Sequence, residues 1–135
     1  MNAKKADRTR TCGRKDALQF LARAESHLEA IELLEHDLPD SAANLAVSVA
    51  IIASDAVCCA RLGEHSQGAD HSAAVSLLQS VAPGGKAMAK DLSRILAKKY
   101  DAEYRQTALS TNDAKKVIEW TRRLVDNARD AVDRD

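Results

Sequence analysis

Aromatic residues are scarce in this chain of 135 residues: Phe20, Tyr100, Tyr104 and Trp120 are the whole set. A core must therefore be built from Ala, Leu, Val and Ile, which suits close packing of helices better than a sheet. The chain also has only two prolines and five glycines, so long helices meet few interruptions. This composition predicts an all-α protein.

The chain carries no net charge, because its 20 basic residues balance its 20 acidic ones. A global field that would attract nucleic acid or a membrane is therefore absent. Residues 1–15 are an exception, with six cations against one aspartate and a net charge of +5. We expect residues 1–13 to form a basic flexible tail that aids solubility, or alternatively an arm for nucleic acid or an acidic partner. Residues 14–135 are long enough for a single domain.

Only three cysteines occur, Cys12, Cys58 and Cys59, and no CxxC spacing is present. Adjacent cysteines on a helix point in different directions, so we expect no metal site, no cofactor and no disulfide framework. Cys59 is then a small core residue, as in a reducing cytoplasmic compartment. An apolar leader is also missing from the N-terminus, so we expect a cytoplasmic protein without a membrane association.

The stretch from about 41 to 62 is apolar on every face of a helix, which is typical of a helix surrounded by others. It predicts a four-to-five-helix up-and-down bundle around this buried central helix. Its polar residues Asn44, Ser48 and Asp55 share one face, and we expect them to form a hydrogen-bond network between helices. In the functional alternative, Asp55 and Arg61 approach the rim of a cleft.

Apolar periodicity and capping residues place the other helices. The expected helices span residues 14–36, 41–62, 71–81, 86–104 and 112–132. We expect Pro39 to end the first helix and Gly63 to end the second, with residues 63–70 forming a loop. The expected capping residues are Asp40 or Ser41, then Asp70, then Ser110 or Thr111.

Four segments together resemble the HEPN (higher eukaryotes and prokaryotes nucleotide-binding) superfamily, over about residues 14–132. They read DAVCCARLG, GADHSAAVSLLQSV, LSRILAKKYDAEY and STNDAKKVIEWTRRLVDNA. Many prokaryotic members have a late helix ending in a basic residue and an Ala-acidic-Tyr triplet, then a capped final helix. The matching residues here are Lys98 or Lys99, Ala102, Glu103, Tyr104, Ser110, Asp113 and Ala114.

The resemblance implies a helical domain that is commonly a homodimer. It also implies a role beside a minimal nucleotidyltransferase, in a toxin-antitoxin pair or as the substrate-binding partner of that enzyme. Catalytic members are metal-independent ribonucleases with Arg, four to six residues, then His, where His serves as general base and Arg stabilises the phosphorane. Here three residues separate Arg61 from His65 and nine separate it from His71. The motif is not intact, so we expect a non-catalytic protein.

The candidate ligand-binding residues combine two regions of the chain. Asp55, Arg61, Asp70 and His71 would line a polar cleft, and the neighbouring helix would contribute Lys98, Lys99 and Tyr104. The cleft would bind nucleotide or RNA, with Tyr104 stacking on a base. In the plainer alternatives, Asp70 and His71 only start a helix, the lysines complement a helix dipole, and Tyr104 joins the last two helices.

The sequence therefore predicts a HEPN-like binding module that contacts a nucleotidyltransferase, a nucleotide or RNA. One alternative is a metal-independent ribonuclease toxin with a displaced pair, Arg61 and His71. The other is a purely structural dimerisation domain.

Overall fold

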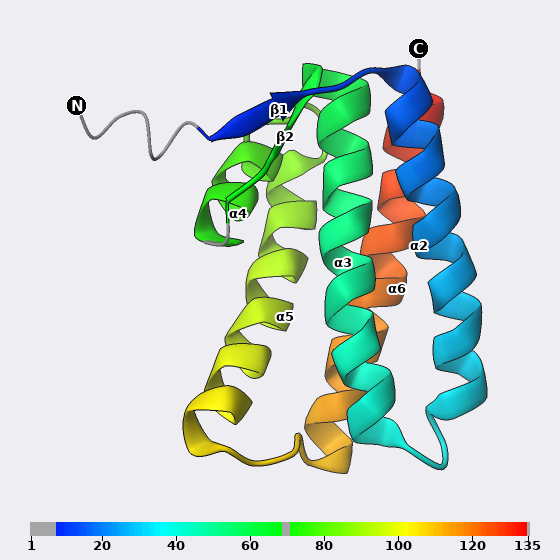
Figure 1. The fold of residues 1–135 in the computed structure, drawn as a ribbon, viewed down its shortest axis with the longest axis vertical. Helices are drawn as coiled ribbons and strands as arrows, with labels where there is room; N and C mark the ends of the chain where they lie inside the picture. Colours follow the sequence, from blue (N-terminus) through cyan, green and yellow to red (C-terminus); the bar gives the residue numbers. More distant parts are fainter. Residues whose placement is uncertain (1–7, 69–70, 135) are drawn as a thin grey trace.

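The computed structural model describes residues 8–68 and 71–134. Its elements, in chain order, are β1 (Thr9–Thr11), α2 (Arg14–Leu34), α3 (Pro39–Leu62), β2 (Glu64–Ser66), α4 (His71–Gln79), α5 (Gly85–Arg105) and α6 (Thr111–Asp133). The four long helices alternate in direction, as Figure 1 shows. We call the end with β1, β2 and α4 the strand end, and the end with the α2–α3 and α5–α6 connections the turn end. The prediction of an all-α bundle is confirmed, and each helix begins and ends within two residues of its expected bounds.

Helix α3 supplies much of the core and packs against α2, α5 and α6. Its buried residues are mainly alanine and valine, whose small side chains let neighbouring helices approach closely. The helix has the length and apolar composition of a membrane span, yet 56% of its most apolar stretch is buried inside the bundle.

Helix α3 is not buried on every face. Ser41, Asn44 and Ser48 are exposed, and the Asn44 amide donates to the Asp40 carbonyl within the same helix. The expected polar network between helices is therefore wrong for Asn44 and Ser48. A strip of polar residues on a helix fits a solvent-exposed stripe as well as a network between helices, and Ser41, Asn44 and Ser48 of α3 face solvent.

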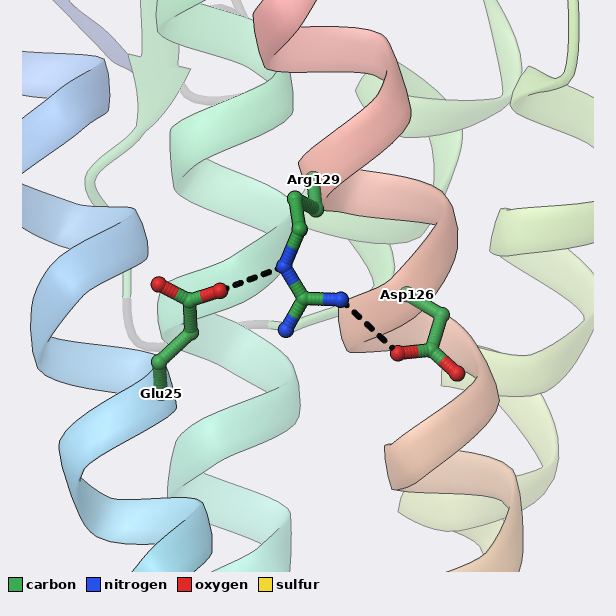
Figure 2. A network of polar contacts seen from close by, with 3 residues as sticks. All are labelled: Glu25, Asp126 and Arg129. Carbon is green, nitrogen blue, oxygen red and sulfur yellow. Dashed lines mark hydrogen bonds and ion pairs between the residues drawn. The ribbon is translucent and has the colours of Figure 1, made fainter.

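Ion pairs tie α6 to the helices on its two sides. Toward α2, the Arg129 guanidinium lies between Glu25 and Asp126, as Figure 2 shows. Toward α5, the Arg123 guanidinium donates to both carboxylate oxygens of Asp91 at 2.9 and 2.6 Å. The Asp91 side chain is only 4% exposed, so this bidentate pairing compensates a charge that would otherwise be costly to bury.

The helix ends agree only partly with the expected signals. Pro39 begins α3 instead of ending α2, because a helix's first residue needs no amide hydrogen. Asp40 does not cap α3; its carboxylate accepts from the Leu109 amide at 2.8 Å and so holds the α5–α6 connection. Gly63 ends α3 in the left-handed conformation, at φ 75°, as predicted.

Ser110 caps α6, as predicted, by accepting a hydrogen bond from the Asp113 amide at 3.1 Å. The other expected cap, Asp70, lies outside the described residues.

Residues 9–11 of the expected tail and residues 64–66 of the expected loop form a two-stranded ribbon over the strand end. Strands β1 and β2 pair antiparallel, with Arg10 opposite His65, and the Cys12 amide donates to the Gly63 carbonyl at 2.9 Å. The predictions of a flexible tail over residues 9–11 and of a loop over 64–66 are therefore wrong. Strands of three residues are too short for the alternation of apolar and polar residues to be detected in a sequence.

Candidate functional site

The predicted site residues fall into two groups at opposite ends of the bundle. Asp55 and Arg61 lie in the last two turns of α3, and His71 begins α4, all at the strand end. Lys98, Lys99 and Tyr104 lie in the last turns of α5, at the turn end, as the course of the helices in Figure 1 shows. The two groups do not form one cleft.

The distance between these two groups of residues can be estimated along α3. Lys99 shares a pocket with Asn44, and Asn44 precedes Asp55 by eleven residues. At a rise of 1.5 Å per residue, that is about 16 Å along the helix axis. A single small ligand cannot contact both groups at once.

At the turn end, Lys99 lines a pocket of about 270 Å³ together with Asp40 and Asn44. Lys98 forms an ion pair with Asp113 at 3.2 Å, and Lys99 with Glu103 at 3.8 Å. Tyr104 is 90% exposed, so it does not join α5 to α6, and that alternative is wrong.

At the strand end, Arg61 and His71 have different neighbours. The Arg61 guanidinium donates to the Arg134 carbonyl at 2.9 Å, at the end of α6, whereas α4, which begins at His71, packs against α5, α3 and β2. Within residues 8–68 and 71–134, no hydrogen bond or ion pair joins the two side chains. This arrangement gives no support to a displaced Arg/His catalytic pair.

A disulfide joins Cys12 to Cys59, with the two Cα atoms 5.3 Å apart. The expectation of no disulfide, with Cys59 as an ordinary core residue, is therefore wrong. The cysteines are 47 residues apart in the chain, but α2 and α3 are antiparallel neighbours. The start of α2, two residues after Cys12, therefore lies beside the last turn of α3. That pairing of helix ends is the signal that sequence reasoning could have used.

His65 of β2 lies beside this disulfide. Its Nδ1 is 2.9 Å from the Ser66 carbonyl oxygen and 3.8 Å from an Asp55 carboxylate oxygen. The Phe20 ring packs edge-on against the imidazole, with ring centroids 5.5 Å apart. Burial raises the pKa of Asp55 to about 6, and the nearby His65 opposes that rise.

The sulfur atoms of Cys12 and Cys59 and one imidazole nitrogen of His65 all lie within 4.8 Å of one another. We refer to Cys12, Cys59, His65 and Asp55 together as the strand-end cluster. Cys58 is a neighbour but not a member, since it is buried and free. Burial, with a smaller contribution from Asp55, raises the pKa of Cys58 to about 12.

A second feature is a cationic surface where α5 and α6 pack together. On α5, Lys90, Arg94 and Lys98 follow one another at spacings of four, on one side of the helix. Two residues of α6, Trp120 and Arg123, contact α5 on this side. Arg94 Cζ lies 5.8 Å from the centroid of the Trp120 ring, and Arg123 donates a hydrogen bond to Asp91.

Lys116 precedes Trp120 by one turn and so extends the same side of α6. We call this surface the α5–α6 face, made of Lys90, Arg94, Lys98, Lys116, Trp120 and Arg123.

Carboxylates neutralise only part of the α5–α6 face. Asp113 pairs with Lys98, Asp91 pairs with Arg123, and Glu119 interacts electrostatically with Arg123. Lys90, Arg94 and Lys116 are exposed, and none of them has an ion-pair partner in the described part of the chain. A chain without net charge thus presents a local excess of positive charge.

No protein-family model, curated protein or solved structure matches the chain.

Proposed function

We propose that this chain is a non-catalytic RNA-binding module and that the α5–α6 face contacts the RNA. The observation that supports it best is a set of three cations on this face, Lys90, Arg94 and Lys116, which have no ion-pair partner among the described residues, with Arg94 over the half-buried Trp120. Cations without carboxylate partners can neutralise phosphates and release their counterions, which is the main source of affinity for nucleic acids.

The shape of the face favours a single strand. Tyr104 follows Arg94 by ten residues along α5, or about 15 Å of helix. At 3.6 residues per turn Tyr104 lies about 80° around α5 from Arg94, so a flexible strand would bend around the helix from the α5–α6 face to reach the exposed ring of Tyr104. Aromatic rings and arginine planes stack on unpaired bases, whereas the bases of a duplex are already stacked. The resemblance of residues 14–132 to the HEPN superfamily agrees with this class of ligand.

The proposal excludes catalysis on two grounds. The spacing of Arg61 to His65 and to His71 does not match the ribonuclease motif. The Arg61 guanidinium also donates to the Arg134 carbonyl at the end of α6, and within residues 8–68 and 71–134 it forms no hydrogen bond or ion pair with His71. The chain would bind RNA without cleaving it.

Fluorescence anisotropy with a labelled single-stranded RNA, repeated over a range of salt concentrations, tests the proposal. The double variant Lys90→Gln/Lys116→Gln should bind about tenfold more weakly. Its plot of log affinity against log salt should be less steep by about 1 to 2, since each phosphate contact contributes about 0.7 for single strands. An RNA duplex of the same sequence should bind more weakly than the single strand.

The matched control is Lys15→Gln/Arg23→Gln, which removes the same charge from exposed positions on α2, on the other side of the bundle from α5 (Figure 1). It should bind RNA like the wild type. An equal loss in both variants, or no RNA binding by the wild type, would contradict the proposal. RNA cleavage in EDTA that His71→Ala abolishes would instead support the ribonuclease alternative.

A further inference from the structure

The strand-end cluster brings together two thiol-bearing residues and an imidazole from three separate parts of the chain. Cys12 precedes α2, Cys59 lies in the last turn of α3, and His65 lies in β2. Their potential ligand atoms are all within 4.8 Å of one another. With the disulfide formed, the sulfurs are bonded to each other and cannot bind a cation. Reduction would leave two thiols beside the imidazole.

We propose that the reduced strand-end cluster is a zinc site, with Cys12 Sγ, Cys59 Sγ and the His65 imidazole as the protein ligands. Two thiolates and one imidazole suit Zn²⁺, which binds in a tetrahedron and accepts water as its fourth ligand. The disulfide and the zinc complex are then two alternative states of the same residues, and redox conditions select between them.

The geometry requires only a small rearrangement. Zinc–sulfur bonds of about 2.3 Å in a tetrahedron place two sulfur atoms about 3.7 Å apart, so the two sulfurs that are bonded to each other in the disulfide would move apart after reduction. Cys12 can supply the movement, because it lies between β1 and α2 outside any helix and is only half-buried. Its exposed side also gives a reductant and a metal ion access to the site, whereas Cys59 is 2% exposed.

The surroundings of His65 resemble those of a zinc-binding histidine. A carbonyl oxygen can only accept, so the 2.9 Å contact to Ser66 places the proton on Nδ1. The Asp55 carboxylate lies on the same side of the ring, 3.8 Å from Nδ1. Nε2 then carries the lone pair that can bind a metal. In zinc sites, the ring nitrogen that does not bind the metal usually donates to a carbonyl or a carboxylate in the same way.

The reaction balances with a dithiol as the reductant. The dithiol gives two electrons and two protons to the Cys12–Cys59 disulfide and becomes a disulfide itself. Zinc binding then displaces the two thiol protons to solvent. Both states join the segment before α2 to the end of α3, so the metal would keep the ribbon attached under conditions that reduce the disulfide.

The experiment uses the full chain, reduced by a phosphine and then titrated with Co²⁺, which reports thiolate ligands and tetrahedral geometry through its absorption bands. Zinc per chain is measured by mass spectrometry of the gel-filtered protein. We expect one metal ion per reduced chain and none per oxidised chain. Cys12→Ser and His65→Ala should each weaken binding at least tenfold and change the Co²⁺ spectrum. The oxidised protein should yield a peptide in which Cys12 is linked to Cys59.

Cys58→Ser is the matched control, because it removes a neighbouring thiol that is not part of the cluster, and its spectrum should equal that of the wild type. Circular dichroism shows whether each variant is folded. Zinc should also slow alkylation of Cys12 in the wild-type protein, a measurement that needs no variant. Lack of metal uptake by the folded, reduced wild type would overturn the proposal, and so would unchanged binding by Cys12→Ser or loss of binding in Cys58→Ser.

Discussion

At the scale of single residues, Asp55 is the group whose environment most directly sets a pH dependence. Burial raises its pKa from 3.8 to about 6, so the folded protein holds this proton more tightly than the unfolded chain does. Stability from this group is therefore present below about pH 4 and is lost as the pH rises through 6. By 1.36 kcal/mol per pKa unit, the loss is about 3 kcal/mol, and the pKa of about 6 already includes the opposing effect of His65.

Asp55→Asn should therefore stabilise the protein at pH 8, by about 1–3 kcal/mol, and have little effect at pH 4. The amide keeps the shape of the side chain and cannot ionise. Urea unfolding of the disulfide-bonded protein in EDTA, at both pH values, measures the difference. A gain of equal size at pH 4 and pH 8 would show that ionisation of Asp55 is not its cause.

At the scale of elements, the connection between α4 and α5 depends on Gly85. This residue is buried at the first position of α5. A Cβ there would lie 2.5 Å from the Leu78 carbonyl oxygen and 3.0 Å from that of Gln79. Both atoms belong to the backbone at the end of α4, so neither can move without displacing that helix.

Gly85→Ala should consequently destabilise the fold by about 1–3 kcal/mol, as overpacking does. Thermal unfolding followed by circular dichroism measures the effect. Gly13→Ala is the control, since its Cβ would meet nothing within 4 Å; it should change stability by at most about 1 kcal/mol, through weaker capping of α2. Similar losses in the two variants would mean that crowding at Gly85 is not the cause.

The elements also show what this sequence could and could not predict. Apolar periodicity and terminal residues such as Gly63 and Ser110 place all five helices, because a helix of nine residues or more repeats its signal. The prediction for Pro39 is wrong because proline can follow the end of one helix or occupy the first position of the next, and only the packing decides. The ribbon of β1 and β2 left no signal, since its pairing involves residues more than fifty positions apart.

At the scale of the whole molecule, the candidate site depends on topology more than on residue type. Arg61 and Lys99 both follow apolar stretches and could belong to one cleft by sequence alone. The up-and-down path puts the end of α3 and the end of α5 at opposite ends of the bundle (Figure 1). The same path brings Cys12 to Cys59 and His65, which no local spacing indicates.

The disulfide closes a loop that contains α2 and most of α3, and its two cysteines are separated by 47 positions in the sequence. Loop-closure entropy predicts that such a cross-link stabilises the fold by up to about 4 kcal/mol, because it restricts the unfolded chain. Reduction in EDTA should therefore lower the midpoint of urea unfolding strongly, since EDTA prevents any metal from replacing the disulfide. In the absence of urea, α2, α3 and α6 should stay folded. The packing of these helices does not depend on the ribbon, since their shared core lies below it.

Cys58→Ser separates this effect from a general effect of the reductant. The variant keeps the disulfide, so reduction should lower its midpoint as much as that of the wild type. Cys12→Ser already lacks the cross-link, and reductant should leave its midpoint unchanged. A midpoint that falls equally in all three proteins would mean that the reductant destabilises the fold by some route other than the Cys12–Cys59 bond.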